Sequence, residues 1–255
     1  MQKLMAIFAH PDDEGAIGGT LARYATAGTE VTLVCGTRGE VGEISDPSLA
    51  TPETLGDVRQ KELEAACGVM GIQNLEFLNY RDSGMVDTPE NDDPRALVQA
   101  NPDEFKARVQ ALFDKYQPEV VVTFEPFGWY GHPDHIAVSK WVTEMFPATD
   151  SSGHTPAKLY HAVIRFSRFA AKIQAAVEAG YIDGSGFGNS DEGPRPEQIA
   201  AEASITHIIN TTAQAEQKGA AMQHHKTQFG PVHMFNKIPR DLMMEAYGTE
   251  NFAQV

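Results

Sequence analysis

Two short polar segments of this sequence carry the residue types that bind divalent metal ions. The first covers residues 10–14 (HPDDE) and the second covers residues 130–135 (YGHPDH). One histidine in a loop is usually a surface or packing residue, whereas two segments of matching chemistry indicate a shared function. Histidine and carboxylate groups together are typical of a catalytic zinc ion that keeps one position open for water.

The first segment has a structural explanation that competes with metal binding. Asp12 or Asp13 could cap a helix, with Glu14 in its first turn. Capping accounts for one acid, but not for a histidine beside three carboxylates that repel one another unless a cation or exposure relieves them. Pro11 restricts His10 to extended geometry, so His10 and Asp13 could converge on one point of a tight turn. We therefore favour a metal site.

The ligand set that we expect is His10, Asp13 and His135, two imidazoles and one carboxylate. Further groups remain for catalysis. Asp12 could be the general base for a metal-activated water, and His132 could face a developing oxyanion or protonate a leaving amine. The expected role of Asp134 is a hydrogen bond to an imidazole, and that of Tyr130 is oxyanion stabilisation. These roles suit hydrolysis of an amide through a tetrahedral intermediate.

Two other kinds of protein share these ligand types. An iron(II) oxygenase also uses two histidines and one carboxylate, but by analogy that site is usually built on an all-β fold. A non-catalytic metal-binding module would usually saturate the ion with protein ligands, and the spare Asp12 argues for an open site. A dinucleotide site is rejected because the glycines at 15, 18 and 19 lack the required spacing.

Alternating strand and helix patterns must position these residues. We predict strands at 4–9, 31–35, 75–78 and 120–124, and helices at 16–27, 57–70, 102–116 and 136–146. Short apolar strands between helices indicate an α/β fold with a mostly parallel sheet. In the common strand order 3-2-1-4-5, the first and fourth strands are neighbours and ligands bind at their carboxyl ends. The two polar segments follow these two strands.

The second half of the chain is less regular. We predict strands at 159–166 and 205–209, helices at 169–179 and 213–225, and loops at 44–56, 82–101 and 184–196. We expect one domain over residues 1–255. In it, residues 1–145 form the catalytic core, and residues 146–255 form an extension that shapes the pocket.

Composition restricts the partners and the compartment. The 255 residues include 42% hydrophobic residues and carry a formal net charge of -15, which argues against nucleic acid or an anionic membrane as a partner. Two cysteines favour a reducing compartment over a disulfide framework. The first residues are apolar too briefly for a secretory signal, and no apolar run approaches the roughly 20 residues that span a bilayer. We expect a cytoplasmic location.

The two polar segments resemble the signature motifs of the PIG-L/LmbE-like N-deacetylase family. Residues 37–40 (TRGE) and Arg59 with Glu62 resemble weaker family features, and residues 80–85 (YRDSGM) resemble the branch that acts on the glucosaminyl precursor and conjugates of mycothiol. The resemblance covers residues 1–145. Later, only Lys218 and residues 225–228 (HKTQ) resemble a C-terminal feature.

This resemblance implies a Rossmann-like fold and a zinc-dependent removal of the acetyl group from an N-acetylglucosamine-type amide. It implies His10, Asp13 and His135 as ligands, Asp12 as base, and His132 and Tyr130 at the oxyanion or leaving group. Substrate contacts map to Arg59 and Asp82. The alternative within the family is a mycothiol S-conjugate amidase. In the cell the ion could be iron(II), the partner is a small amino-sugar substrate, and a homo-oligomer is expected.

Overall fold

The computed structural model describes residues 2–146, 153–182, 194–230 and 233–255. A seven-stranded sheet with the order β3-β2-β1-β4-β5-β7-β6 forms its centre. The strands are β1 (Lys3–Phe8), β2 (Glu30–Cys35), β3 (Asn74–Phe77), β4 (Val120–Phe124), β5 (Lys158–Val163), β6 (His207–Asn210) and β7 (Thr249–Gln254). The expected α/β fold with the order 3-2-1-4-5 is therefore confirmed, and two further strands extend the sheet beyond β5.

The central strands of the sheet are almost completely buried. β1, β2 and β4 are short apolar runs, as expected for parallel strands that are covered on both faces. β1 pairs in parallel with β2 on one side and with β4 on the other. The strand order therefore reverses between β1 and β4, and their carboxyl ends lie side by side at the position where such sheets bind ligands.

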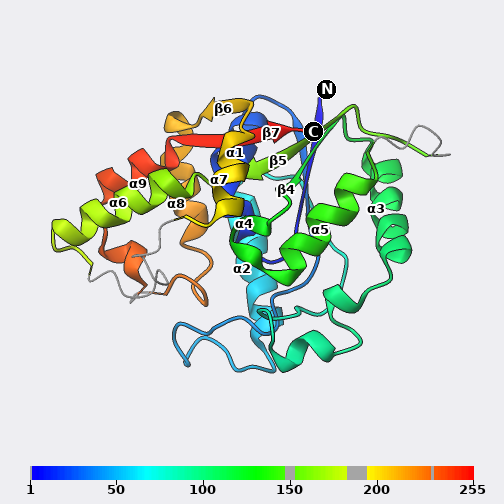
Figure 1. The fold of residues 1–255 in the computed structure, drawn as a ribbon, viewed down its shortest axis with the longest axis horizontal. Helices are drawn as coiled ribbons and strands as arrows, with labels where there is room; N and C mark the ends of the chain where they lie inside the picture. Colours follow the sequence, from blue (N-terminus) through cyan, green and yellow to red (C-terminus); the bar gives the residue numbers. More distant parts are fainter. Residues whose placement is uncertain (1, 147–152, 183–193, 231–232) are drawn as a thin grey trace.

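Helices cover the sheet from both sides. Those in the described residues are α1 (Gly18–Thr26), α2 (Leu55–Met70), α3 (Pro102–Tyr116), α4 (Gly128–Gly131), α5 (Pro133–Glu144), α6 (Phe166–Glu178), α7 (Pro196–Ala203), α8 (Ala215–Met222) and α9 (Arg240–Tyr247). In Figure 1, α3 and α5 lie together on one side of the central strands, and α1, α2 and α8 lie together on the other. The polar segment after β1 leads into α1 through a short turn, and the polar segment after β4 leads into α5.

Helices α2 and α3 begin and end close to their predicted bounds, whereas α5, predicted over 136–146, begins three residues earlier at Pro133 and ends at Glu144. Asn101 caps α3 by accepting a hydrogen bond from the backbone N–H of Asp103 at 2.8 Å, and Pro102 occupies the first helical position. α2 begins at Leu55, two residues before the predicted start, and Gly71 ends it with a left-handed φ of 74°.

The helix predicted over residues 16–27 has a different beginning. Residues Asp13–Ile17 form a 3-10 turn, η1, and the regular helix α1 starts only at Gly18. Asp12 precedes this turn with φ 103°, and its side chain makes no capping hydrogen bond. The capping explanation of the first polar segment is therefore wrong for Asp12.

The C-terminal part departs most from prediction. The predicted strand 159–166 ends at Val163 because α6 begins at Phe166. The helix predicted over 213–225 is regular only from Ala215 to Met222. Helices α7 and α9 and strand β7 were not predicted. β7 has the polar sequence TENFAQ and lies antiparallel between β5 and β6, so its burial results from tertiary contacts rather than from its own pattern.

Two of the predicted loops differ in what the structure describes of them. The loop predicted over residues 82–101 contains two short 3-10 turns, η2 (Pro89–Asp92) and η3 (Leu97–Gln99). Of the loop predicted over residues 184–196, residues 184–193 lie outside the described residues, and α7 begins at Pro196.

Two features of the described residues concern covalent links and membranes. Cys35 and Cys67 are free thiols, and both are buried. Among residues that the structure describes, no helix is both long enough and apolar enough to cross a bilayer.

Candidate metal centre and active site

The two polar segments meet at the carboxyl ends of β1 and β4. His10 Nδ1 lies 3.1 Å from His135 Nε2, although 125 residues separate them. The Asp13 carboxylate lies 3.6 Å from the same nitrogen of His10 and 3.3 Å from that of His135. None of the three residues is more than 7% exposed. The structure thus brings together the three residues that the sequence suggests as metal ligands.

The hydrogen bonds of the two imidazoles determine which nitrogens carry protons. His135 Nδ1 lies 3.2 Å from the carbonyl of Gly128 and must donate to it, so its Nε2 presents a lone pair. His10 Nε2 lies 3.0 Å from a carboxylate oxygen of Asp134 and donates to it, so in the neutral ring Nδ1 also presents a lone pair. Two lone pairs and the Asp13 carboxylate converge on one point. Such a donor set is repulsive unless a cation lies within it.

The spacing of these donors agrees with zinc. Tetrahedral zinc with ligands at 2.0–2.1 Å places neighbouring ligand atoms about 3.3 Å apart. His10 Nδ1 and His135 Nε2 are 3.1 Å apart, and the two oxygens of Asp13 face them separately, Oδ2 at 3.6 Å from His10 and Oδ1 at 3.3 Å from His135. The types and spacing of these groups are compatible with a zinc-like divalent ion.

Other buried groups surround the same point. The ligand atoms of His10, His132 and His135 lie within 4.8 Å of one another, as do those of His10, Asp82, His132 and Asp134. Burial lowers the pKa of His10, but the carboxylates of Asp82, Asp134 and Asp13 outweigh it and raise this pKa well above its ordinary value. The field at the centre of the cluster therefore favours positive charge.

Asp134 orients the His10 ring by contacting Nε2, the ring nitrogen that does not face His135. Its Oδ2 lies 3.0 Å from His10 Nε2 and also accepts the backbone N–H of Ser83 at 3.0 Å. The Ser83 hydroxyl donates a short hydrogen bond to the other carboxylate oxygen. The expected hydrogen bond between an imidazole and Asp134 is thus present, with His10 Nε2–H as the donor, and Ser83 is a residue that the sequence interpretation missed. The Asp-Ser-Gly turn after β3 was the signal that could have found it.

His132 caps α5 and faces the centre of the cluster. Its Nδ1 accepts the backbone N–H of Asp134 at 3.1 Å, so the proton of the neutral ring is on Nε2. Burial, together with the neighbouring imidazoles of His10 and His135, lowers the pKa of His132 to about 4. A neutral ring whose Nε2–H is free to donate is the form that binds a developing oxyanion.

Asp12 occupies a strained turn beside the cluster. Its backbone has φ 103°, a conformation that non-glycine residues rarely adopt. Burial raises the pKa of its carboxyl to about 6, although Arg59, 3.3 Å away, opposes this rise. A carboxylate with a pKa near neutrality suits a general base.

The two residues expected to contact substrate are both buried. Arg59 is 3% exposed and donates to the carbonyls of Pro11 at 2.5 Å and Gly39 at 3.1 Å, so its guanidinium supports the Asp12 turn. Asp82 is also 3% exposed, and one of its oxygens lies 3.4 Å from His10 Nε2. The structure places both beside the cluster, and their substrate contacts stay predictions.

A tight turn after β4 places Tyr130 at the edge of the site. Glu125 builds this turn by accepting the backbone N–H groups of Phe127 and Trp129 at 2.7 and 2.6 Å. Tyr130 is 43% exposed, and the centre of its ring lies 5.1 Å from that of His135. Its exposure beside His135 suits contact with an incoming substrate.

A buried contact that the sequence did not predict lies behind Asp12. Glu14 Oε2 accepts the Asp12 backbone N–H at 2.9 Å, and Glu14 Oε1 lies 2.6 Å from Nε2 of His225. Glu14 and His225 are 1% and 0% exposed, respectively. The resemblance of residues 225–228 to a family feature was the only sequence signal for this contact.

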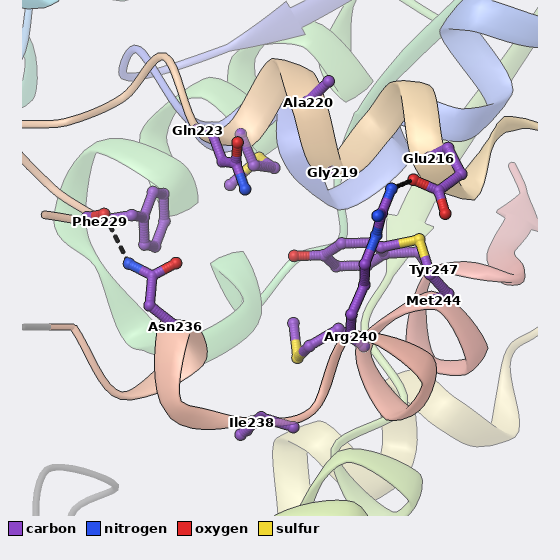
Figure 2. A pocket seen from close by; sticks show the side chains of 12 residues that line it. Glu216, Gly219, Ala220, Gln223, Phe229, Asn236, Ile238, Arg240, Met244 and Tyr247 are labelled. Atoms are coloured by element: carbon purple, nitrogen blue, oxygen red, sulfur yellow. Dashed lines mark hydrogen bonds and ion pairs between the residues drawn. The ribbon is translucent and has the colours of Figure 1, made fainter. Parts of the chain in front are cut away.

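Two cavities lie between the C-terminal helices. The one in Figure 2, about 420 Å³, lies between α8 and α9, and the figure shows Arg240 beside Glu216 with the Tyr247 ring across its wall. The second, about 570 Å³, is largely apolar and extends between α6, α8 and α9 to residues 15–17. It therefore reaches the back of η1, the turn that carries Asp13.

Comparison with known proteins identifies relatives over the whole chain. A family model described as GlcNAc-PI de-N-acetylase (PIG-L) matches residues 5–146. A 1D-myo-inositol 2-acetamido-2-deoxy-alpha-D-glucopyranoside deacetylase from Acidothermus cellulolyticus is 36% identical over 99% of this chain and 88% of its own length. A protein of the same name from Kineococcus radiotolerans is also 36% identical, over 89% of this chain and 69% of its own.

Solved structures show the same fold in proteins of different activity. N,N'-diacetylchitobiose deacetylase from Pyrococcus horikoshii aligns with a TM-score of 0.66 at 20% identity, covering 100% of this chain and 84% of that chain. A 4-carboxy-2-hydroxymuconate hydratase from Pseudomonas putida aligns with a TM-score of 0.65 at 18% identity, over 100% and 96%. The fold therefore supports more than one chemistry, and the activity must be argued from the site.

Proposed function

Because this chain belongs to the PIG-L family of GlcNAc-PI de-N-acetylases, we propose that it removes the N-acetyl group of an N-acetylglucosaminyl-inositol. The curated relatives at 36% identity carry that substrate in their names. The observation that carries the proposal is the convergence of His10, Asp13 and His135 at the carboxyl ends of β1 and β4.

In this proposal the three converging residues hold a divalent ion, with zinc as the preferred metal. These residues are buried, and their nitrogen and oxygen atoms lie 3.1–3.6 Å from one another across the site. When bound, zinc would polarise the amide carbonyl and lower the pKa of a water molecule to about 7. One of the similar solved structures is described as a zinc-inhibited form of teicoplanin deacetylase, so excess zinc belongs among the conditions to be varied.

The remaining residues of the cluster supply proton transfer and charge stabilisation. Asp12 takes the proton from the attacking water, whose oxygen forms the new bond to the acetyl carbon. The Nε2–H of His132 and the Tyr130 hydroxyl donate to the oxyanion of the tetrahedral intermediate. Asp12 then returns its proton to the leaving nitrogen as the C–N bond breaks. The products are acetate and the free amino sugar.

We propose that Asp82, Arg59 and the C-terminal extension, residues 146–255, contribute to substrate recognition. The Asp82 carboxylate lies beside His10, where it would accept a hydrogen bond from a sugar hydroxyl, and Arg59 supports the turn that carries Asp12. Helices α6, α8 and α9 line a cavity that reaches residues 15–17, which supports a role of residues 146–255 in shaping the pocket.

The substitution Asp12→Asn tests the assignment of the base. We expect amide hydrolysis to fall by about 10²–10⁴-fold, because Asn cannot accept the proton from water. Metal content should stay that of the unchanged protein, since Asp12 is not one of the three converging donors. Turnover and bound metal would be measured on the same preparation. Undiminished turnover would contradict the base assignment, and loss of metal would move Asp12 into the ligand set.

Metal and substrate can be tested together in one assay of released amine. The protein stripped with a chelator should be inactive and should regain activity with zinc or, without oxygen present, with iron(II). N-acetylglucosaminyl-inositol and a mycothiol S-conjugate amide would be compared as substrates. Preference for the S-conjugate would assign the chain to the amidase branch, and activity only with iron(II) and oxygen would contradict hydrolysis altogether.

A further inference from the structure

The turn that carries Asp12 needs support from its surroundings. A non-glycine residue at φ 103° costs about 1–3 kcal/mol and persists only where neighbouring groups hold it. Gly15 N–H donates to the Asp12 carbonyl at 2.9 Å, which closes the turn from one side. The Asp12 backbone N–H points the other way, to the carboxylate of Glu14.

Glu14 connects this turn to a distant part of the chain. Its Oε2 accepts the Asp12 N–H at 2.9 Å, and its Oε1 lies 2.6 Å from His225 Nε2, across 211 residues of sequence. Neither Glu14 nor His225 is more than 1% exposed. A buried carboxylate is costly unless it is paired and hydrogen-bonded, so the contact with His225 is what holds Glu14 in place beneath Asp12.

The segment that carries His225 is itself held in place. Thr227 donates its backbone N–H and its hydroxyl to the two carboxylate oxygens of Glu62, at 2.9 and 2.6 Å. The Gln228 amide donates to the Glu43 carbonyl at 2.8 Å. His225 Nδ1 has no hydrogen-bond partner among the described residues, so Glu14 is the polar group that orients its ring.

We propose that Glu14 and His225 are positioning residues for the general base: His225 fixes Glu14, and Glu14 fixes the backbone of Asp12 in the orientation that directs its carboxylate at the attacking water. This inference rests on the proposed function, in which Asp12 is that base. The inference gives a function to the HKTQ segment, residues 225–228, which does not itself face the centre of the cluster.

A second buried pair provides a matched control. Lys218 and Glu250 are 2.7 Å apart and nearly inaccessible, and they also join the C-terminal part to the beginning of α1. Glu250 accepts the backbone N–H groups of Gly19 and Thr20, not that of Asp12. The substitution Glu250→Gln therefore loosens a comparable buried pair without touching the base.

The experiment is a double-mutant cycle between His225→Leu and Asp12→Asn. In the unchanged background, His225→Leu should lower kcat by about 10–100-fold, because misplacement of a reacting group by about 1 Å has effects of this size. KM, metal content and the native fold should be retained. In the Asp12→Asn background, the same change should alter the residual rate by no more than about twofold, since the group being positioned is already gone.

Two further variants keep the test decisive. His225→Gln retains an N–H that can donate to Glu14 and should restore most of kcat. If His225→Leu does not accumulate as folded protein, Glu14→Gln replaces it in the cycle, because one amide oxygen cannot accept both hydrogen bonds of the carboxylate. Glu250→Gln should lower the melting temperature but leave kcat unchanged at temperatures where the protein is folded.

The outcomes separate this inference from the proposed function. If His225→Leu lowers kcat equally in both backgrounds, the positioning role is overturned. The base assignment would still stand in that case, provided that Asp12→Asn by itself lowers kcat as expected. Unchanged turnover in Asp12→Asn would overturn the base assignment itself, and the positioning role with it. A fall in kcat confined to the background with an intact Asp12 supports both.

Discussion

At the residue scale, Gly128 determines how His135 can face the cluster. Its carbonyl accepts the His135 Nδ1–H, and its backbone has φ +66°. A Cβ at this position would lie 2.6 Å from the His135 Cβ and 3.0 Å from the backbone nitrogen of Ile136. Only a residue without a side chain allows this close approach. The orientation of the His135 nitrogen that we propose as a metal ligand thus depends on a glycine that has no side chain.

The substitution Gly128→Ala should therefore displace the His135 ring. We expect metal affinity and turnover to fall by about 10–100-fold, as happens when the partner of a metal-binding histidine is lost. Titration of the metal-free protein with zinc, followed by the amine-release assay, would measure both. Gly68→Ala is the matched control, because a Cβ there meets nothing within 4 Å inside α2. It should stabilise the protein slightly and leave metal affinity unchanged.

The sequence predicts individual site residues where two motifs of matching chemistry follow neighbouring strands. His10, Asp13 and His135 could be brought together on that basis, because strand order determines which loops meet. Ser83 and His225 had only weaker signals, an Asp-Ser-Gly turn and the resemblance of residues 225–228, because each acts through hydrogen bonds to a residue far away in the sequence. Such contacts depend on the three-dimensional path of the chain and leave no periodic pattern.

At the element scale, β7 joins the C-terminal part to α1, the helix that follows the candidate metal site. Its Glu250 accepts the N–H groups of Gly19 and Thr20 at 2.9 and 2.7 Å, at the beginning of α1. The same carboxylate pairs with Lys218 of α8, and neither side chain is more than 7% exposed. One buried charge therefore connects β7, α8 and α1.

Neutralising that charge should destabilise the fold. Glu250→Gln leaves the buried Lys218 ammonium without its ion pair, and removal of one partner of such a pair costs roughly 3–5 kcal/mol of unfolding free energy. Urea unfolding would measure the change. The exposed pair of Arg240 and Glu216 provides the comparison, and Arg240→Gln should change the unfolding midpoint little, because water screens an exposed pair. Equal effects of both changes would contradict the argument.

The elements that the sequence predicted well are those that bury continuous apolar faces. β1, β2 and β4 and helices α2 and α3 are of this kind, and their bounds agree with prediction to within about two residues. β7 was missed because Glu250 and Asn251 are buried polar residues, which interrupt the alternation expected of a strand. Their burial is stabilised by partners in other elements.

At the scale of the whole molecule, one histidine away from the metal cluster links stability to pH. His161 in β5 is buried, and its Nε2 lies 2.9 Å from the Thr143 hydroxyl in α5. Burial lowers the pKa of His161 from 6.5 to about 4. The unfolded chain therefore binds this proton at a higher pH than the folded protein does. The stabilisation is complete above pH 6.5 and is lost as the pH falls toward 4.

His161→Gln should remove this contribution to acid sensitivity. The difference in unfolding free energy between pH 7 and pH 4 should be smaller in the variant by roughly 3 kcal/mol, the value of the pKa shift. Urea unfolding at several pH values in this range would measure it. His207→Gln, a change at an exposed position of β6, should leave the pH dependence as it was. Parallel pH curves for the unchanged protein and His161→Gln would refute the prediction.

The overall architecture was predictable as far as parallel pairing extends. Alternating strands and helices predicted the order from β3 through β5, because crossover connections restrict how parallel strands neighbour one another. The antiparallel continuation through β7 and β6 was not predictable from the sequence. No short hairpin joins these strands, and their order in the sheet differs from their order in the chain. Pairings of that kind require the folded core as a template.

The position of β7 in the sheet has a consequence for biosynthesis. A ribosome makes residues 207–210 before residues 249–254, yet in the finished sheet β7 separates β6 from β5. Until residues 249–254 emerge, one margin of β5 has unsatisfied backbone hydrogen-bonding groups, and β6 has no strand beside it. During this interval the nascent chain is most exposed to pairing of its free strand edge with strands of other chains. The residues of the candidate metal site have already been synthesised by then.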